Sequence, residues 1–527
     1  MNAFLIKLFR AIFGVIMTVT LTLSSSILPP DIPSGTGSGN FGILEYPSLR
    51  TLESAGISEA ELKSRADAQD DIYSESRGYS DIGGLTVSPY YTATVAGTAV
   101  PVYSATVFLG TSLKGALHSF SEIYFEPDSD ISFNIELTPL SIAIRNALVL
   151  PKSLNVEADC SNGRVKALIE DFGTYTFLFN DAGQEYAYTL FVREKTDEDS
   201  EIAKYKSEYG AENVIVFDKG VYNFDYINIE NDNTVIFLKD GAYLEANHMF
   251  DIMSDDDDAR ISEDGASEAN GIGLWRYPFI NFHNCNNVKI VGHGVIDLSA
   301  LDRHERRGVV FTFCNNVEVS GIKIINAPEW SFITYQCENV SIENTDVFGY
   351  RINSDAFAIC NSRNVTVNGC FARSGDDLFD VKTLGGSEDA VSDGISFTNC
   401  IAWAGKARCF GICGEVNRRI SNVSFSDCAV IYRDGTWSDD RIASLAVVVE
   451  QGGGSISDVL FENIEIFRDD GRAICCTVYG EDIENFTAEN IVFKNISYIS
   501  RLPVKVASNG MGGNKMEITI DGTLYRA

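Results

Sequence analysis

Three aspartates have a spacing that could support acid–base chemistry. Asp355 stands two residues after Asn353, and the adjacent pair Asp376 and Asp377 follows 21 and 22 residues later, directly after a glycine. If the fold brings these carboxyl groups together, mutual repulsion should keep one of them protonated near neutral pH. A proton donor beside a base is what acid–base cleavage of a glycosidic bond requires. Aspartates are also common in solvated turns, so the spacing alone leaves that alternative open.

A repeated phrase in the C-terminal region predicts the element that would position the aspartates. The phrase is a polar residue or glycine, an aliphatic residue, any residue, and another apolar residue. Its aliphatic anchors are Val288, Val317, Val340, Val365, Ile395, Val423, Val459 and Ile491, spaced by 29, 23, 25, 30, 28, 36 and 32 residues. A period of this length with β-branched alternation predicts a right-handed parallel β-helix. The aspartates are about one coil apart, so their side chains should converge at the strand spacing of about 4.8 Å.

The remaining chain predicts an all-β protein with further units ahead of the β-helix. Residues 1–26 have a basic start, an apolar run and small residues, as in a secretory signal peptide; an uncleaved membrane anchor is the alternative. Residues 27–84, which begin rich in Pro, Gly and Ser, predict a linker of low order. Short alternating runs in 85–205 predict a small antiparallel β-sandwich domain, and 206–527 would form the β-helix catalytic domain.

Composition excludes several classes of function. The formal net charge of -33 gives a surface that repels nucleic acid and anionic membranes. Only five histidines are present and no CxxC pair occurs, so we expect no metal site and no cofactor. Most cysteines stand at equivalent places in the repeats and are interpreted as small buried residues, although some could be oxidised. These repeat cysteines are Cys285, Cys314, Cys337, Cys360, Cys370, Cys400 and Cys428.

The aspartate segments resemble those of a known enzyme family. Asn353–Asp355 and Gly375–Asp377 are similar in type, order and spacing to the Asn-Thr-Asp and Gly-Asp-Asp motifs of the polygalacturonases, glycoside hydrolase family 28. The resemblance covers about 214–498 and implies a pectin-lyase-like solenoid. A β-sandwich ahead of a β-helix is also similar to the dextranase and isopullulanase family, glycoside hydrolase family 49. The resemblance implies inverting hydrolysis, with Asp376 as general acid and the other two aspartates deprotonating the attacking water.

Two departures from the polygalacturonase pattern bear on the substrate. The region 406–411 lacks the Gly-His-Gly of that family, and His293 lies 62 residues before Asp355, in the wrong coil. The strand 446–450 is apolar and then acidic where polygalacturonases carry Arg-Ile-Lys. These departures favour a neutral glycan over a pectin-related one, although Arg408 or Arg441 could still hold an anionic sugar.

Six residues are candidates for contact with the substrate: Arg408, Lys406, Lys382, Glu415, Glu450 and Asn353. The first two follow the aspartate pair by one coil, and Lys382 could neutralise the aspartates from an alternate strand position; solvated surface or a surface ion pair is the alternative for these side chains. Further weak candidates are Trp275, Trp330 and Trp403 for sugar stacking or packing under loops, and Asp255–Asp258 for a calcium loop or an acidic insertion.

The sequence therefore predicts a secreted, monomeric glycoside hydrolase that acts on a polysaccharide or oligosaccharide. It would bind no nucleic acid, no cofactor and, after signal cleavage, no membrane. Two other classes stay open: a non-catalytic β-helix that binds glycans or mediates adhesion, and a polysaccharide lyase, which would need calcium and an Arg or Lys base.

Overall fold

The computed structural model describes most of the chain, and strands dominate it. The described residues are 41–46, 84–109, 114–247, 278–301, 305–434 and 438–527. They contain a single α-helix, α3 (Glu198–Tyr209), so the all-β prediction is confirmed. The predicted signal peptide, most of the predicted linker, Trp275 and the acidic run Asp255–Asp258 lie outside these residues. No helix in the described ranges is long and apolar enough to cross a membrane.

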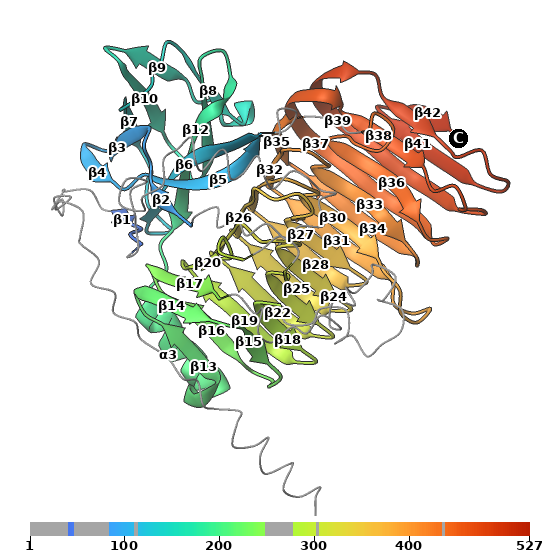
Figure 1. Cartoon of the computed structure of the whole chain (residues 1–527), viewed down its shortest axis with the longest axis horizontal. Helices are drawn as coiled ribbons and strands as arrows, with labels where there is room; N and C mark the ends of the chain where they lie inside the picture. The colour runs from blue at the N-terminus through green and yellow to red at the C-terminus, as the bar shows by residue number, and fades with distance from the viewer. Residues whose placement is uncertain (1–40, 47–83, 110–113, 248–277, 302–304, 435–437) are drawn as a thin grey trace, which may run out of the picture.

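The C-terminal region is a right-handed parallel β-helix in which most coils contribute three strands (Figure 1). Equivalent strands of successive coils pair in parallel, which gives the helix three faces. The first face contains β13 (Val214–Phe217), β16 (Val235–Leu238), β19 (Asn286–Gly292), β22 (Asn315–Ser320), β25 (Glu338–Glu343), β28 (Arg363–Asn368), β31 (Ser392–Thr398) and β34 (Ile420–Ser426). It continues into the long strands β37 (Ser455–Arg472) and β39 (Thr487–Leu502) and ends at β41 (Lys515–Ile520) and the antiparallel β42 (Thr523–Arg526).

The other two faces carry the strands on either side of the predicted site. The second face contains β14 (Gly220–Phe224), β17 (Ala242–Ala246), β20 (Val295–Asp297), β23 (Lys323–Ile325), β26 (Asp346–Phe348), β29 (Phe371–Ser374), β32 (Ile401–Ala404) and β35 (Ala429–Arg433). The third face contains β15 (Ile227–Ile229), β18 (Ile280–His283), β21 (Val309–Thr312), β24 (Phe332–Tyr335), β27 (Phe357–Cys360), β30 (Phe379–Thr383), β33 (Phe410–Val416), β36 (Leu445–Gln451), β38 (Ile474–Val478) and β40 (Lys505–Ala507).

The repeat predicted from the sequence sets the register of the first face. Each aliphatic anchor pairs with the next one along the chain. The order is Val288, Val317, Val340, Val365, Ile395, Val423, Val459 and Ile491. The residue before each anchor, asparagine in six of the eight cases, adopts a left-handed backbone, for example Asn287 at φ 55° and Asn316 at φ 56°. Their amides bond side chain to side chain, Asn316 Nδ2 to Asn287 Oδ1 at 3.0 Å, rather than to the backbone of the neighbouring coil.

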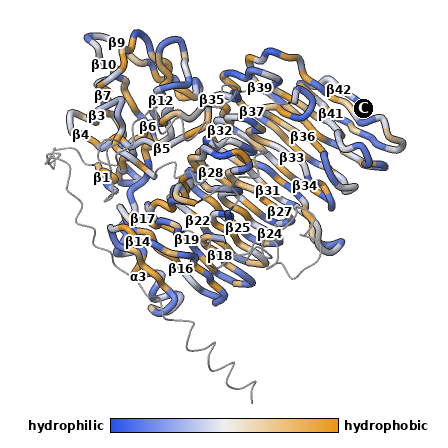
Figure 2. The backbone as a smooth tube through the Cα atoms, viewed as in Figure 1, coloured by the Kyte–Doolittle hydropathy of each residue, from blue (hydrophilic) through white to orange (hydrophobic). Residues whose placement is uncertain are grey.

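Alternate residues of most strands are buried in the interior of the β-helix. Hydrophobic and hydrophilic residues are accordingly interspersed along its strands (Figure 2). Aromatic rings stack from coil to coil, as Phe357 on Phe379 at 5.1 Å and Phe379 on Phe410 at 5.0 Å between centroids. All twelve cysteines are free, and those of the repeats are buried, so the interpretation of these residues as small core side chains holds. Burial of this continuous apolar stack is the main favourable term that holds the coils together.

The helix α3 was not expected from the sequence, which shows only a charged stretch there. Asp197 caps its N-terminus by accepting a hydrogen bond from the Ser200 main-chain N at 3.2 Å. Its buried residues Ile202 and Tyr205 pack on the first strands of the first face, including Phe237. The helix therefore covers apolar side chains on the outer surface of the first coils, which would otherwise be exposed to water.

Ahead of the β-helix lies a sandwich of two sheets. One sheet contains β1 (Phe41–Ile43), β2 (Thr86–Val87), β5 (Tyr103–Leu109), β6 (Lys114–Phe125), β8 (Ala147–Leu150), β11 (Gly173–Phe179) and β12 (Gly183–Glu194). The other contains β3 (Tyr91–Val95), β4 (Thr98–Val100), β7 (Phe133–Pro139), β9 (Ala158–Ser161) and β10 (Arg164–Ile169). The expectation of an antiparallel sandwich is wrong at one pair, because β6 and β12 run parallel. The domain boundaries assigned from sequence stay predictions.

The sandwich packs on the second face of the β-helix. Phe120 stacks on Phe348 with ring centroids 5.0 Å apart, within an apolar cluster that joins both units. Lys323 of the β-helix forms buried ion pairs with Glu122 of the sandwich and with Asp346, the latter at 2.7 Å. A buried charge left without its partner is costly, so these pairs favour a single docked position.

Candidate active site

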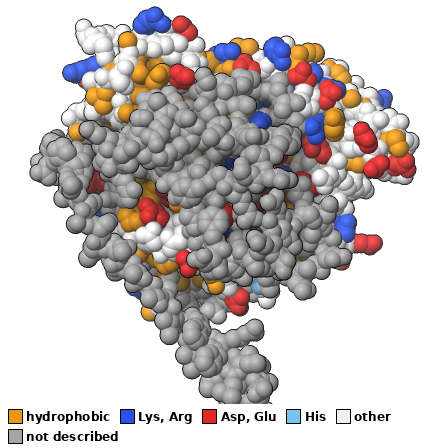
Figure 3. All heavy atoms as spheres, viewed as in Figure 1, with side chains coloured by type: hydrophobic (Ala, Val, Ile, Leu, Met, Phe, Trp, Pro, Cys, Tyr) orange, Lys and Arg blue, Asp and Glu red, His pale blue; other side chains and the backbone are white. Residues whose placement is uncertain are grey.

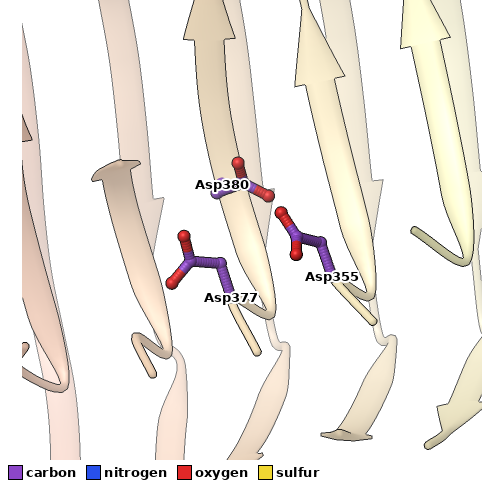
Figure 4. A group of neighbouring side chains, drawn as sticks. All are labelled: Asp355, Asp377 and Asp380. Atoms are coloured by element: carbon purple, nitrogen blue, oxygen red, sulfur yellow. The ribbon is translucent and has the colours of Figure 1, made fainter. Parts of the chain in front are cut away.

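The predicted catalytic residues lie in the turns between the second and third faces. Phe357 pairs with Phe379 and Phe379 with Phe410 in the parallel ladder, so the residues two positions earlier also form a column. That column contains Asp355, Asp377 and Arg408. Asp355 and Asp377 are buried. In Figure 4 the Asp355 carboxylate points toward the coil of Asp377 and toward Asp380 on β30, whereas the Asp377 carboxylate points away from Asp355, toward the following coil. Ligand atoms of the three carboxylates lie within 4.8 Å of one another.

Asp376 occupies the same turn as Asp377 and is partly exposed. Its Oδ2 accepts a hydrogen bond from the Asn353 main-chain N at 2.9 Å, and its Oδ1 accepts one from the Asp377 main-chain N at 3.0 Å. Removal from water raises its pKa from 3.8 to about 6, Asp377 adds repulsion, and Lys382 and Arg408 partly offset both effects. Asp376 can therefore carry a proton in mildly acidic solution.

Lys382 neutralises part of the negative charge, as anticipated. Its Nζ lies 3.1 Å from Asp355 Oδ2, 3.4 Å from Asp380 Oδ2, 3.9 Å from Asp377 Oδ2 and 3.4 Å from Glu415 Oε2. Burial alone would lower the pKa of Lys382, but these carboxylates raise it well above its usual range. The three aspartates could together hold a cation, and the Lys382 ammonium already supplies positive charge at that place.

Asp380 is the acidic residue that the sequence reasoning missed. Burial raises its pKa from 3.8 to about 7, with Lys382 opposing the shift and Asp377 and Glu415 reinforcing it. Burial likewise raises the pKa of Asp355 well above 3.8, against the effect of Lys382 and with repulsion from the other aspartates. Strand alternation in 379–383 was the available signal, because Asp380 and Lys382 must point to the same side of β30.

Arg408 comes from the next coil and binds Asp377 twice. Its main-chain N donates to Asp377 Oδ1 at 3.0 Å, and its Nη1 donates to Oδ2 at 2.9 Å. Its Nη2 pairs with Glu450, which also lies 3.5 Å from Arg441 Nη1. Opposite charges raise the pKa of Arg408 well above its usual value although burial alone would lower it, and the foremost of them is Asp377.

The structure thus brings together five of the six residues expected to contact substrate. Glu415 and Glu450 reach the site through ion pairs with Lys382 and Arg408. Asn353 takes part through its main-chain N, which binds Asp376. Lys406 lies in the turn after β32, half-buried, and no described side chain forms an ion pair with it.

The turns that carry the aspartates are held by buried polar contacts. A Cβ on Gly375 would lie 2.3 Å from the Arg351 carbonyl oxygen, so only glycine lets this turn approach the preceding coil. The Arg351 guanidinium donates to main-chain carbonyls of Leu298, Ser299, Leu301 and Asn326. Phe108 of the sandwich packs on Tyr350 with centroids 5.8 Å apart, so the sandwich also supports the turn before Asp355.

Aromatic residues near the site differ from those considered in the sequence. Trp403 is buried under the sandwich beside Arg373, and Trp330 is 2% exposed with Lys382 Nζ 4.6 Å from its ring centroid, so neither presents an open ring face. Tyr479, which follows β38, is 42% exposed and lies beside Arg441, whose guanidinium is 4.4 Å from the ring centroid. The composition of the sequence gave no signal that singled out Tyr479.

Two other features lie away from the aspartates. His293 packs against Tyr124 of the sandwich, so its exclusion from the site holds. An open groove of about 480 Å³ lies on the first face, between β19 and β28, and is lined by the asparagine ladder together with side chains such as Lys289 and Glu318. Lys289 and Glu318 pair with each other there, and the groove contains none of the site residues.

Comparison with known proteins bears on the same region. The model of Glycosyl hydrolases family 28 matches residues 258–500. Polygalacturonase QRT2 of Arabidopsis thaliana is 26% identical over 259 residues, which is 44% of this chain and 55% of that protein. Endopolygalacturonase B of Emericella nidulans is 25% identical over 198 residues, 35% of this chain and 50% of that protein. The chain thus spans about half the length of these two relatives.

Among solved structures, Dex49A from Penicillium minioluteum is similar in fold. It superposes with a TM-score of 0.54 at 14% identity, covering 84% of this chain and 90% of that one. Such a likeness extends over the sandwich as well as the β-helix, and at this identity it bears on the fold alone. The β-helix of this chain is similar in sequence to the glycosyl hydrolases of family 28 over residues 258–500.

Proposed function

We propose that the protein is a glycoside hydrolase that cleaves a polysaccharide by inverting acid–base catalysis at the aspartate cluster. The observation that carries the proposal is the convergence of Asp355 and Asp377 within one column, with Asp376 in the same turn as Asp377. Similarity to family 28 over residues 258–500 supports the reaction class.

Each aspartate has a role that its surroundings favour. Asp376, whose pKa is about 6 and whose side chain is partly exposed, donates its proton to the glycosidic oxygen as the C–O bond breaks. Asp355 and Asp377 hold a water molecule on the opposite side of the sugar ring, and one of them takes a proton from it as it attacks. The attack from that side inverts the anomeric configuration.

The neighbouring cations orient the two carboxylates that hold the water. Arg408 binds both oxygens of Asp377, and Lys382 on β30 binds Asp355 of the preceding coil and Asp380 of its own strand. Because these contacts are made before substrate arrives, they stabilise charge in the transition state without further rearrangement. Secretion remains part of the proposal and rests on the N-terminal segment of the sequence.

The decisive experiment measures reducing-sugar release from a panel of neutral and acidic polysaccharides by the wild type and Asp376→Asn. Loss of the acid should lower kcat on the cleaved polymer by about 10²–10⁴-fold. Asp128→Asn, an exposed aspartate of the sandwich, serves as the matched control. Proton NMR of the first product should show the inverted anomer.

Each result of that experiment has a defined meaning. Full activity of Asp376→Asn would remove that residue from the reaction. Tight binding of one polymer without cleavage would instead favour a glycan-binding β-helix, and an unsaturated product would indicate a lyase.

A further inference from the structure

The site around the aspartates contains more carboxyl groups than cations, and its cations are already paired. Each of the two buried cations of the site, Lys382 and Arg408, already contacts more than one carboxylate of the protein. The carboxylates of the site are Asp355, Asp376, Asp377, Asp380, Glu415 and Glu450, whereas its cations are Lys382, Arg408 and Arg441. Because burial raises the pKa of Asp376 to about 6 and that of Asp380 to about 7, the excess of negative charge is small in mildly acidic solution and grows as the pH rises.

Two glutamates, neither of them assigned a step in catalysis, account for much of this balance. Glu415 Oε2 lies 3.4 Å from Lys382 Nζ, on the side of the ammonium toward the next coil. A register irregularity in β33 next to Gly414, at φ 84°, places Glu415 there, and a β-bulge of this kind redirects a side chain. Glu450 pairs with both Arg408 and Arg441 from β36.

These pairs occupy the donors that a sugar carboxylate would need. Arg408 directs one guanidinium nitrogen to Asp377 and another to Glu450, and its Nε binds the Arg441 carbonyl at 2.9 Å. A uronate placed beside the aspartates would meet further negative charge in a region from which water is largely excluded. Repulsion between like charges is strong under such conditions and acts against an unwanted ligand.

We propose that Glu415 and Glu450 are specificity-determining residues that restrict the cleavage site to sugar units without a carboxylate. The inference rests on the proposed hydrolase function and names its substrate class: a neutral polysaccharide, or one whose uronates are esterified. On the described surface that is visible in Figure 3, both acidic and basic side chains occur.

Lys406 is the basic residue near this turn that could contradict the inference. It lies in the turn of the coil after Asp376, and among the described side chains none forms an ion pair with it. This lysine could bind an acidic sugar, because Arg408 and Arg441 are already paired with carboxylates of the protein. A preference for an acidic polymer that disappears in Lys406→Gln would therefore overturn the proposal.

The test uses pairs of polymers that differ only in the carboxylate. A neutral polymer that the protein cleaves is compared with its form oxidised to the carboxylate at C6, and an acidic one with its carboxyl-reduced and methyl-esterified forms. The carboxylate-bearing member should show kcat/KM at least about tenfold lower at low salt, with a smaller difference at high salt because screening weakens the repulsion. Equal or faster cleavage of the acidic member would overturn the inference and leave the proposed hydrolase standing.

The variant Glu450→Gln tests the assignment to this residue. Removing one carboxylate should reduce the ratio of kcat/KM between the two members of a polymer pair by about threefold to tenfold. The reason is that Arg408 and Arg441 then have nitrogens free to bind a carboxylate of the substrate. Glu517→Gln, which alters an exposed pair with Arg526 at the C-terminal end, is the matched control and should leave the discrimination unchanged. Unaltered discrimination in Glu450→Gln would remove Glu450 from the proposal. If no polymer is cleaved at all, the proposed function fails first and the inference fails with it.

Discussion

Arg408 holds both carboxylate oxygens of Asp377, one through its main-chain N at 3.0 Å and the other through Nη1 at 2.9 Å. The two residues belong to successive coils and occupy equivalent positions in the column that also contains Asp355. A carboxylate held at both oxygens cannot rotate freely. The β-helical repeat therefore does more than bring acidic residues together, since it also supplies the residue that orients one of them.

The first prediction concerns Arg408→Lys. The lysine keeps a positive charge and the main-chain hydrogen bond, but it cannot reach Asp377 and Glu450 at once as the guanidinium fork does. We expect kcat to fall by about 10–100-fold, with KM changed much less, because the loss falls on orientation rather than on substrate contact. Steady-state kinetics on the cleaved polymer measure both values, and activity within about twofold of wild type would contradict the role of Arg408.

The second prediction is an acidic pH optimum. Asp376 acts as the acid only when protonated, and its pKa of about 6 means that the proton is lost as the pH rises through that value. The kcat profile should therefore fall on its alkaline side with an apparent pKa near 6, a value that belongs to the coupled cluster rather than to one residue. A profile that stays flat or rises between pH 5 and pH 8 would rule out Asp376 as the proton donor.

The coil register could be predicted from the sequence because the repeat encodes it directly. The apolar anchors recur wherever a coil must bury a side chain, and the eight anchors pair in the predicted order. The same argument places Asp355 and Asp377 one above the other and Arg408 one coil further on. Each of these positions follows from counting residues along a regular ladder.

Features that depend on side-chain partners could not be predicted in the same way. Asp380 lies in a strand whose side chains alternate between two sides. Its burial against Lys382 depends on how the neighbouring turns pack, which the strand pattern does not encode. The parallel pairing of β6 with β12 joins segments whose own patterns are equally compatible with antiparallel neighbours. The helix α3 has a weak apolar stripe, and its packing on the first coils stabilises it more than its own sequence pattern does.

The third prediction concerns the stability of Asp380→Asn. The folded-state pKa of Asp380 is raised from 3.8 to about 7, chiefly by burial, so its stabilising contribution is complete below pH 4 and is lost as the pH rises through 7. Asparagine resembles the protonated acid at every pH. The variant should therefore match the wild type near pH 4 and exceed its stability at pH 8 by on the order of 2–4 kcal/mol.

Thermal unfolding at pH 4, 6 and 8 measures this difference. Asp482→Asn, at an exposed position of the β-helix, should give midpoints that follow the wild type at all three values. A variant that is equally destabilised across the range would show that Asp380 contributes as a charged partner of Lys382 instead.

The fourth prediction assigns a substrate contact to Tyr479. The Tyr479 main-chain N donates to the Val449 carbonyl at 2.8 Å, which places Tyr479 beside Glu450. Glu450 pairs with Arg408, and Arg408 binds Asp377. Arg441 lies 4.4 Å from the ring centroid and fixes the orientation of an otherwise exposed side chain. A pyranose ring has an apolar face that can stack on such a ring, and we expect Tyr479→Ala to raise KM by about 5–20-fold with kcat changed less.

Tyr479→Phe separates stacking from hydrogen bonding by the hydroxyl group, since it keeps the ring and removes only the oxygen. If stacking is the contribution, the phenylalanine variant should have a KM within about twofold of wild type, a difference below about 0.5 kcal/mol. Tyr498, which is also 42% exposed but lies on the second-face part of β39, where it pairs with Ile466, provides the matched control. Tyr498→Ala should leave KM unchanged, because a substrate that extends from the aspartates along the third face does not reach it. An equal rise of KM in both alanine variants would indicate a general loss of structure at the C-terminal coils and would remove Tyr479 from the substrate path.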